Sequence, residues 1–224
     1  MKAVIFDMDG VLVDVSRSYR LTIKKTAEYF LGQDIHISQI QEYKNKGGFN
    51  NDWDLTERIL NDNGKKISKE MIVNVFQRFY LGEKHNGLIK NEEWLLDGNI
   101  LEHIQKNFKT GIVTGRPKKE AFYVLERFQK KSFFSVLITM DDVPSNKVKP
   151  DPFGIQLALQ KLKSHKAFYV GDTVDDMKAA TRANIIPIGV ASDTKKYEEQ
   201  SKLLLNHGAK WILKDINDIR EALE

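Results

Sequence analysis

Short apolar runs that alternate with amphipathic helical patterns constrain the fold of this chain more than any other feature. From about residue 97 onward the same order of apolar run, turn and helix recurs, with runs at residues 111–114, 136–139, 167–170, 185–188 and 211–213. Strands that are apolar on both sides are typical of a parallel sheet covered by helices on both faces. The apolar run at residues 2–6 has the same character and is predicted to join that sheet. The sequence therefore predicts an α/β fold with a parallel sheet between two layers of helices.

Residues 15–94 interrupt this alternation. They contain apolar residues at helical spacing and no convincing strand, and the predicted helices are 17–31, 38–46, 51–62 and 68–82. A run of helices with its own apolar positions can bury a small core of its own. We therefore expect residues 15–94 to form a helical domain inserted after the first strand, and residues 1–14 and 95–224 to form the α/β core.

Composition excludes several kinds of chemistry and partner. The 224-residue chain contains no cysteine, which excludes disulfides, thiolate zinc sites and a cysteine nucleophile. Its net charge is +4, from 35 Lys and Arg against 31 Asp and Glu, and its lysine pairs are spread over helix-like stretches, which indicates solvated helix faces and no nucleic-acid partner. No apolar run approaches the roughly 20 residues that cross a bilayer. The first apolar run is too short for a signal peptide, so we expect a cytoplasmic protein with no membrane partner.

Polar residues follow the predicted strands at the edge where ligands bind. In an open parallel sheet, ligands bind at the carboxyl ends of the strands. The segments that follow or connect the apolar runs and carry reactive side chains are 7–14, 114–117, 147–152 and 171–176. The candidate functional residues are therefore expected in these four segments.

The first and last of these segments supply carboxylates. Asp7 and Asp9 are two residues apart, so in an extended chain both side chains point the same way, and Gly10 lets the backbone turn away. Asp172 would arrive from a neighbouring strand, and the repulsion among the three groups calls for a cation. Carboxylate oxygens without histidine or cysteine ligands favour a hard cation, and Mg²⁺ is the natural candidate.

The two middle segments supply groups that bind phosphate. The Thr114 hydroxyl and the Gly115 amide precede a helix opened by proline, and the Lys149 ammonium can neutralise a further phosphoryl oxygen. Together they would hold a phosphoryl group in line with Asp7 as the nucleophile. Asp9 would protonate the leaving oxygen and later take a proton from water. The sequence thus predicts a Mg²⁺-dependent phosphatase that works through an aspartyl-phosphate.

In this order, the four segments resemble the four motifs of the haloacid dehalogenase-like (HAD) superfamily. The helical insert resembles the cap of its phosphoglycolate phosphatase and β-phosphoglucomutase branch, and the resemblance covers essentially the whole chain. It implies a Rossmann-like three-layer core with an inserted helical cap. It also implies that Asp7 is the nucleophile and that Asp9 is the acid/base whose carbonyl contacts the metal. The remaining implied roles are phosphate binding by Thr114 and Lys149 and magnesium binding by Asp172 and Asp176, with Asp175 left open as an alternative to Asp176.

Each motif taken alone also has a structural interpretation. Asp-Gly after a strand is a common turn, Asp151-Pro152 is an ordinary helix start, and Thr173 with Asp176 resembles a capping box. Four motifs in the required order, each tied to a predicted strand, favour the joint functional interpretation.

Residues 44–53 are the most informative part of the insert. They are rich in hydrogen-bonding side chains and contain a Gly47-Gly48 pair between two predicted helices. In one interpretation Asn50 or Asn51 simply caps the next helix. In the other, the segment reaches over the site as the corresponding cap region does in the resembled branch, and Lys46 and Asn51 contact the non-phosphate part of the substrate.

Several functions remain open at this level. Hydrolysis of a small phosphorylated metabolite is the leading hypothesis, and a phosphosugar mutase would use the same Asp7 and Asp9. A non-catalytic phosphate-sensing module is a weaker alternative, because the set of catalytic side chains is complete. Phosphoglycolate, a sugar phosphate, a nucleotide or a phosphorylated amino-acid precursor would each fit, and both a monomer and a homodimer are compatible with the sequence.

Overall fold

The computed structural model describes residues 1–46 and 51–223 and divides the chain into two compact units. The core unit comprises residues 1–13 and 94–224, and the helical unit comprises residues 14–93. These boundaries lie one residue from those predicted after residues 14 and 94. That the two units fold as separate domains stays a prediction.

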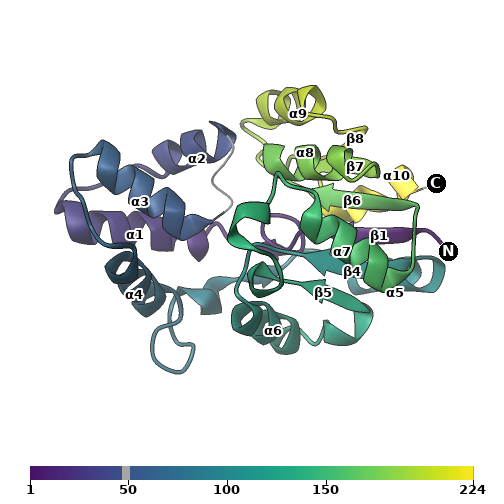
Figure 1. Cartoon of the computed structure of the whole chain (residues 1–224), viewed down its shortest axis with the longest axis horizontal. Coiled ribbons are helices and arrows are strands. Elements are labelled where there is room, and N and C mark those ends of the chain that lie inside the picture. Colours follow the sequence, from purple (N-terminus) through teal and green to yellow (C-terminus); the bar gives the residue numbers. More distant parts are fainter. Residues whose placement is uncertain (47–50, 224) are drawn as a thin grey trace. The chain divides into compact units, whose positions relative to one another are not determined.

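The core unit is built on a six-stranded parallel sheet with the order β5-β4-β1-β6-β7-β8, which confirms the predicted α/β fold (Figure 1). Every strand overlaps a predicted apolar run. The strands are β1 Ala3–Phe6, β4 Lys109–Val113, β5 Val136–Ile138, β6 Ala167–Gly171, β7 Ile186–Val190 and β8 Trp211–Leu213. The first strand of the chain lies inside the sheet, so both its edges are paired.

Helices cover both faces of this sheet, as the continuous apolar strands require. Ala3 and Ile5 pack into a buried cluster with α7 and α8, whereas Val4 and Phe6 point to the other face and are also fully buried. In Figure 1, α7 and α8 lie in front of the sheet. The helices of the core unit are α5 Gly98–Asn107, α6 Lys118–Arg127, α7 Phe153–Leu162, α8 Val174–Arg182, α9 Tyr197–Asn206 and α10 Ile219–Leu223.

Strand register brings the carboxyl ends of β4, β1 and β6 to one edge. Phe6 at the end of β1 is level with Ile112 on β4 and with Val170 on β6. The next residue, Asp7, continues the ladder by donating its backbone N–H to the Val170 carbonyl at 2.8 Å. Segments that are more than 100 residues apart in the sequence therefore end side by side.

In its described residues, the helical unit contains α-helices close to their predicted bounds: α1 Tyr19–Leu31, α2 Ile37–Lys46, α3 Asp52–Asp62 and α4 Lys69–Tyr80. Its core contains the stacked rings of Tyr19 and Tyr80, whose centroids are 4.2 Å apart. The buried Glu92 carboxylate accepts hydrogen bonds from the Tyr80 hydroxyl at 3.0 Å and the Ser18 hydroxyl at 2.8 Å. This pairing satisfies a buried acid that would otherwise be costly.

Two very short strands mark the passage between the units and were not predicted. β2 Val13–Asp14 pairs with β3 Glu93–Trp94, and the Leu95 N–H donates to the Leu12 carbonyl at 2.9 Å. Strands of two residues are too short to show a period in the sequence. Short 3₁₀ helices lie at Leu88–Asn91, Lys131–Phe133, Met140–Asp142, Ser145–Lys147 and Ile216–Asp218. Within the described ranges, no helix combines the length and the apolar character that crossing a membrane demands.

Candidate active site

Three of the predicted site residues stand at the carboxyl ends of adjacent strands in the core unit. Asp7 follows β1, Thr114 follows β4 and Asp172 follows β6. Asp7 and Thr114 are buried, with 6% and 4% of their surfaces exposed, whereas Asp172 is partly exposed. The sheet therefore positions a carboxylate and a hydroxyl in a nearly water-free environment beside a more accessible acid.

Lys149 lies in the segment before α7 and reaches into this cluster. Its ammonium nitrogen is 3.0 Å from Asp7 Oδ1 and 2.6 Å from Asp176 Oδ1, and only 7% of its side chain is exposed. Burial alone would lower the pKa of Lys149, but the carboxylates of Asp176 and Asp7 outweigh burial and raise it well above its ordinary value. Lys149 is therefore a fixed positive charge against the predicted nucleophile.

Asp176 and Tyr169 hold the Lys149 ammonium from behind. Lys149 donates to the Tyr169 hydroxyl at 3.2 Å, and that hydroxyl lies 3.2 Å from Asp176 Oδ1. The other oxygen of Asp176 accepts from the N–H of Thr173 at 3.1 Å and from its hydroxyl at 2.6 Å. Thr173 and Asp176 thus form the capping box of α8, and donors from within the chain face both oxygens of Asp176. Sequence analysis gave Tyr169 no role beyond the strand.

The carboxylates of Asp7, Asp172 and Asp176 form an acidic cluster in which one oxygen from each residue lies within 4.8 Å of the other two. Among the described residues, this cluster includes Asp176 and not Asp175, which was the alternative. Burial raises the pKa of Asp7 well above its ordinary value, with Lys149 opposing the shift. The carboxylates of Asp176, Asp9 and Asp172 add to the increase. A group of carboxylate oxygens with excess negative charge fits a hard cation such as Mg²⁺.

Gly10 allows the first and last motifs to approach each other. Its φ of +76° lies in the left-handed region, and a Cβ at this position would come within 2.2 Å of Asp172 Oδ2. Any side chain here would have to displace Asp172 and would also strain the backbone. The Asp-Gly turn that sequence analysis noted is therefore also a point of close packing against an acidic residue of the site.

Asp9 lies beside the site but its carboxylate is paired with Arg116. Both Nε and Nη2 of Arg116 contact Asp9 Oδ1, at 2.6 and 2.5 Å. Arg116 is 1% exposed, which makes it one of the largest fully buried side chains of the described chain. Sequence analysis placed Arg116 inside a motif without assigning it a function, and its position two residues after Thr114 is the signal that could have drawn attention to it.

The predicted phosphate-binding turn precedes α6 as expected, but some of its groups have partners. The Thr114 hydroxyl accepts the Arg116 N–H at 3.2 Å, and the Lys118 N–H at the start of α6 donates to Asp141 at 2.6 Å. Asp141 therefore satisfies part of the N-terminus of α6. Gly115 lies between these contacts and is partly exposed.

Of the two cap residues predicted to set specificity, the structure describes the side chain of only one. The Asn51 side chain caps α3 by accepting the backbone N–H of Trp53 at 2.9 Å and of Asp54 at 3.4 Å, as the structural interpretation expects. The backbone of Lys46 closes α2, but its side chain, like residues 47–50 with the alternative cap Asn50, falls outside what the structure describes. A substrate contact by Lys46 or Asn51 stays a prediction.

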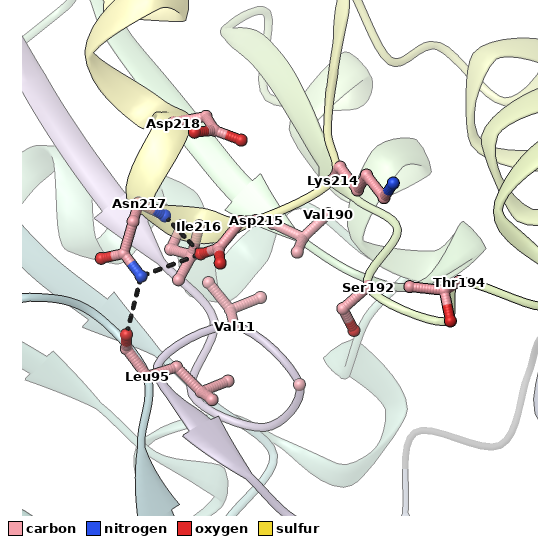
Figure 2. Close-up of a pocket in the computed structure, with 11 residues that line it drawn as sticks. Val11, Leu95, Val190, Ser192, Thr194, Lys214, Asp215, Ile216, Asn217 and Asp218 are labelled. Atoms are coloured by element: carbon pink, nitrogen blue, oxygen red, sulfur yellow. Dashed lines mark hydrogen bonds between the residues drawn. The ribbon is translucent and has the colours of Figure 1, made fainter.

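A pocket of about 370 Å³ is lined in part by Gly10 and Val11, in the turn that follows β1. Figure 2 shows residues that line it, among them Val11, Leu95, Ser192, Thr194 and Lys214. Asn217 shapes one wall by donating to the Leu95 carbonyl at 3.1 Å and to Asp215 at 2.8 Å. Asp7, Lys149 and Asp172 do not line it, so this pocket is distinct from the acidic cluster.

Comparison with known proteins places these features in context. Residues 4–190 match the family described as haloacid dehalogenase-like hydrolase. An imidazoleglycerol-phosphate dehydratase from Phytophthora nicotianae is 36% identical over 199 residues, which are 85% of this chain and 43% of that protein. The chain thus corresponds to less than half of that relative.

A further relative and a solved structure match along nearly their whole length. The pyrophosphatase PpaX from Bacillus pumilus is 28% identical over 226 residues, covering 98% of this chain and 94% of that protein. The crystal structure of a β-phosphoglucomutase from Clostridium difficile superposes with a TM-score of 0.76 at 22% identity, covering 98% of this chain and 93% of the other. At this identity the structural match shows a shared fold.

Proposed function

We propose that this chain, which belongs to the haloacid dehalogenase-like hydrolase family, is a Mg²⁺-dependent phosphatase that hydrolyses a small phosphomonoester through an aspartyl-phosphate. Phosphatase activity itself follows from the family and from relatives named as phosphatases. The observation that carries the detailed mechanism is the contact of Asp7 with the Lys149 ammonium at the end of β1, inside an acidic cluster. A buried carboxylate beside a cation is suited to attack a phosphorus atom whose oxygens need neutralisation.

In the first half of the reaction, an Asp7 oxygen attacks phosphorus while the bond between phosphorus and the ester oxygen breaks. Lys149 and the Thr114 hydroxyl hold the phosphoryl oxygens, so that charge moving onto the phosphoryl group meets preorganised donors. Asp9 gives its proton to the departing oxygen, and the alcohol leaves. The phosphoryl group is then bound covalently to Asp7.

In the second half, water attacks the same phosphorus atom. Asp9, now ionised, accepts a proton from this water as the bond to Asp7 breaks. Inorganic phosphate leaves, Asp7 is again a carboxylate and Asp9 is again protonated. In the mutase alternative, a hydroxyl of a phosphosugar would replace water in this step.

Magnesium would be held by the Asp7 and Asp172 carboxylates and the Asp9 backbone carbonyl. Asp176 also belongs to the predicted ligand set, but its oxygens face Lys149, Tyr169 and Thr173. We therefore assign it to fixing the Lys149 ammonium. When bound, the ion offsets repulsion between the phosphate and the attacking carboxylate.

Magnesium is expected to raise the melting temperature of the protein by binding the acidic cluster. Saturation at about 100 times the Kd stabilises a protein by about 2.7 kcal/mol. The variant Asp172→Asn is expected to lose most of this thermal shift, because it removes one carboxylate ligand. Differential scanning fluorimetry of EDTA-treated protein with and without MgCl₂ measures the effect, with the exposed Asp193→Asn as the matched control. An equal shift in both variants would place the ion elsewhere.

The activity itself is tested with a panel of phosphorylated metabolites while free phosphate and isomerised product are both measured. Phosphoglycolate, pyrophosphate and sugar phosphates belong in the panel, and the first relative adds phosphomonoesters that carry an imidazole ring. Release of phosphate supports the phosphatase, whereas isomer without free phosphate supports the mutase. No turnover of any compound with Mg²⁺ present would favour the phosphate-sensing alternative.

Lys46 and Asn51 are proposed to select the non-phosphate part of the substrate. Lys46→Ala is expected to raise KM or lower kcat for the best substrate of the panel, while p-nitrophenyl phosphate, which lacks that part, is hydrolysed at nearly the normal rate. Steady-state kinetics on both esters measures the difference. Lys66→Ala, an exposed lysine of the same unit, is the control, and equal losses on both esters would remove Lys46 from the specificity determinants.

A further inference from the structure

The two predicted catalytic aspartates are each paired with a different buried cation. Asp7 contacts Lys149, whereas Asp9 contacts Arg116. The side chain of Arg116 is fully buried while that of Asp9 is 29% exposed, so the pair has one end inside the protein and the other toward the solvent. The buried guanidinium of Arg116 therefore fixes the position of the partly exposed Asp9 carboxylate.

Because Arg116 is buried, its pairing with Asp9 differs from an ion pair between two exposed side chains. An arginine side chain removed from water loses its hydration, and a carboxylate in contact with it restores part of that loss. The guanidinium is planar and rigid, so two donors on one acceptor define both the position and the direction of that acceptor. Both contacts fall on Asp9 Oδ1, and neither engages Oδ2.

The chain leaves β1 before it reaches Asp9, so the sheet does not orient this side chain. β1 ends at Phe6, and the backbone turns through residues 8–10, with the Gly10 N–H bonded to the Val13 carbonyl at 2.9 Å. A carboxylate on a turn that is partly exposed has rotamer freedom to lose, and a mispositioned acid/base costs rate steeply. Arg116, which precedes α6 and follows β4, supplies the constraint from another part of the core unit.

We propose that Arg116 is the positioning residue for Asp9. It holds Oδ1 so that Oδ2 exchanges the proton with the leaving oxygen and later with water. This inference rests on the proposed function, because it assumes that Asp9 is the acid/base. It assigns Arg116 no contact with the phosphoryl group.

The test exploits the chemistry of leaving groups. Phenyl phosphate and p-nitrophenyl phosphate present the same reacting group, but p-nitrophenolate departs readily without a proton and phenolate does not. General acid catalysis contributes about 10²–10⁴-fold to rate. In Arg116→Met, kcat/KM for phenyl phosphate is expected to fall by at least about 10-fold more than kcat/KM for p-nitrophenyl phosphate. This ratio reports the first step alone, in which only phenolate needs a well-placed proton, whereas both esters share the later hydrolysis of the aspartyl-phosphate.

Three further variants make the result specific. Methionine fills much of the arginine volume, and the Asp9 carboxylate, whose side chain is 29% exposed, can reach water once the guanidinium is removed, so Arg116→Met is expected to fold, which circular dichroism checks. Arg116→Lys, with one compact ammonium, should recover part of the difference between the two esters. Adding Arg116→Met to Asp9→Asn should cause little further loss on phenyl phosphate, because the acid is already absent. The exposed Arg127→Lys on α6 is the control and should leave both rates unchanged.

Equal losses of kcat/KM on the two esters would overturn the proposal and indicate a structural role. A higher KM on both esters, with weaker inhibition by inorganic phosphate, would also overturn it and would make Arg116 a phosphate ligand. Failure of the proposed function gives a different result, since the wild-type protein would then hydrolyse neither ester or Asp7→Asn would remain active.

Discussion

Asp7→Asn is expected to lower kcat by at least about 1,000-fold on every phosphomonoester that the wild-type protein hydrolyses, because an amide oxygen is a poor nucleophile and removal of a nucleophile is among the costliest changes to an enzyme. The substitution keeps the shape of the side chain, so substrate binding should persist. Single-turnover measurements with radiolabelled substrate would also show no covalent phosphoprotein in the variant.

The folded state should tolerate this change, which separates a chemical defect from misfolding. Burial raises the pKa of Asp7, so its charge is unfavourable in the native protein, and Lys149 keeps Asp176 as a partner when Asp7 is neutral. The melting temperature is therefore expected to stay level or to rise. Asp193→Asn, an exposed acid of the same unit, is the control for both assays. Turnover above one-tenth of normal in Asp7→Asn would contradict the assignment of the nucleophile.

The fold was predictable from the sequence because its strands carry a strong local signal. Residues 167–170, for instance, are apolar on both faces, and this pattern has few solutions other than a buried parallel strand. Once the strands are parallel, their carboxyl ends share an edge, and the positions of Asp7, Thr114 and Asp172 at that edge follow from chain connectivity. The helical unit was predictable for a similar reason, since apolar residues at helical spacing indicate which faces pack together.

The remaining features depend on contacts between distant segments. Asp9 was expected to point the same way as Asp7, on the argument that alternate residues of a strand share a face. That argument ends with β1 at Phe6, and the orientation of Asp9 depends on Arg116, 107 positions away along the chain. The contact of Tyr169 with Lys149 is likewise invisible in sequence, where a tyrosine within an apolar run indicates only a buried strand.

Lys149→Met is expected to lower the free energy of unfolding strongly. The ammonium group separates the carboxylates of Asp7 and Asp176, and its removal leaves two buried acids with no cation between them. Breaking a buried ion pair by removing one partner typically costs about 3–5 kcal/mol. For a chain of this length, each kcal/mol shifts the melting temperature by about 2–4 °C, so a fall of roughly 6–20 °C is expected by circular dichroism.

A neighbouring lysine provides the matched control. Lys147 lies two positions earlier in the same segment, its side chain is 48% exposed, and it is 3.6 Å from Asp151. Exposed ion pairs contribute little, so Lys147→Met should change the free energy of unfolding by no more than about 0.5 kcal/mol. If Lys149→Met lowers the free energy of unfolding by no more than Lys147→Met does, the ammonium does not hold the cluster together.

Adding Asp7→Asn to Lys149→Met identifies the source of the loss. If the single variant is unstable because two buried carboxylates face each other, removing one of them should restore part of the stability, since Asp176 keeps its donors from Thr173 and Tyr169. If the instability instead reflects poor packing of the methionine, the double variant should be no more stable than Lys149→Met. Since neither protein retains the nucleophile and the cation together, both should be inactive, and the free energy of unfolding is the quantity that distinguishes charge repulsion from packing.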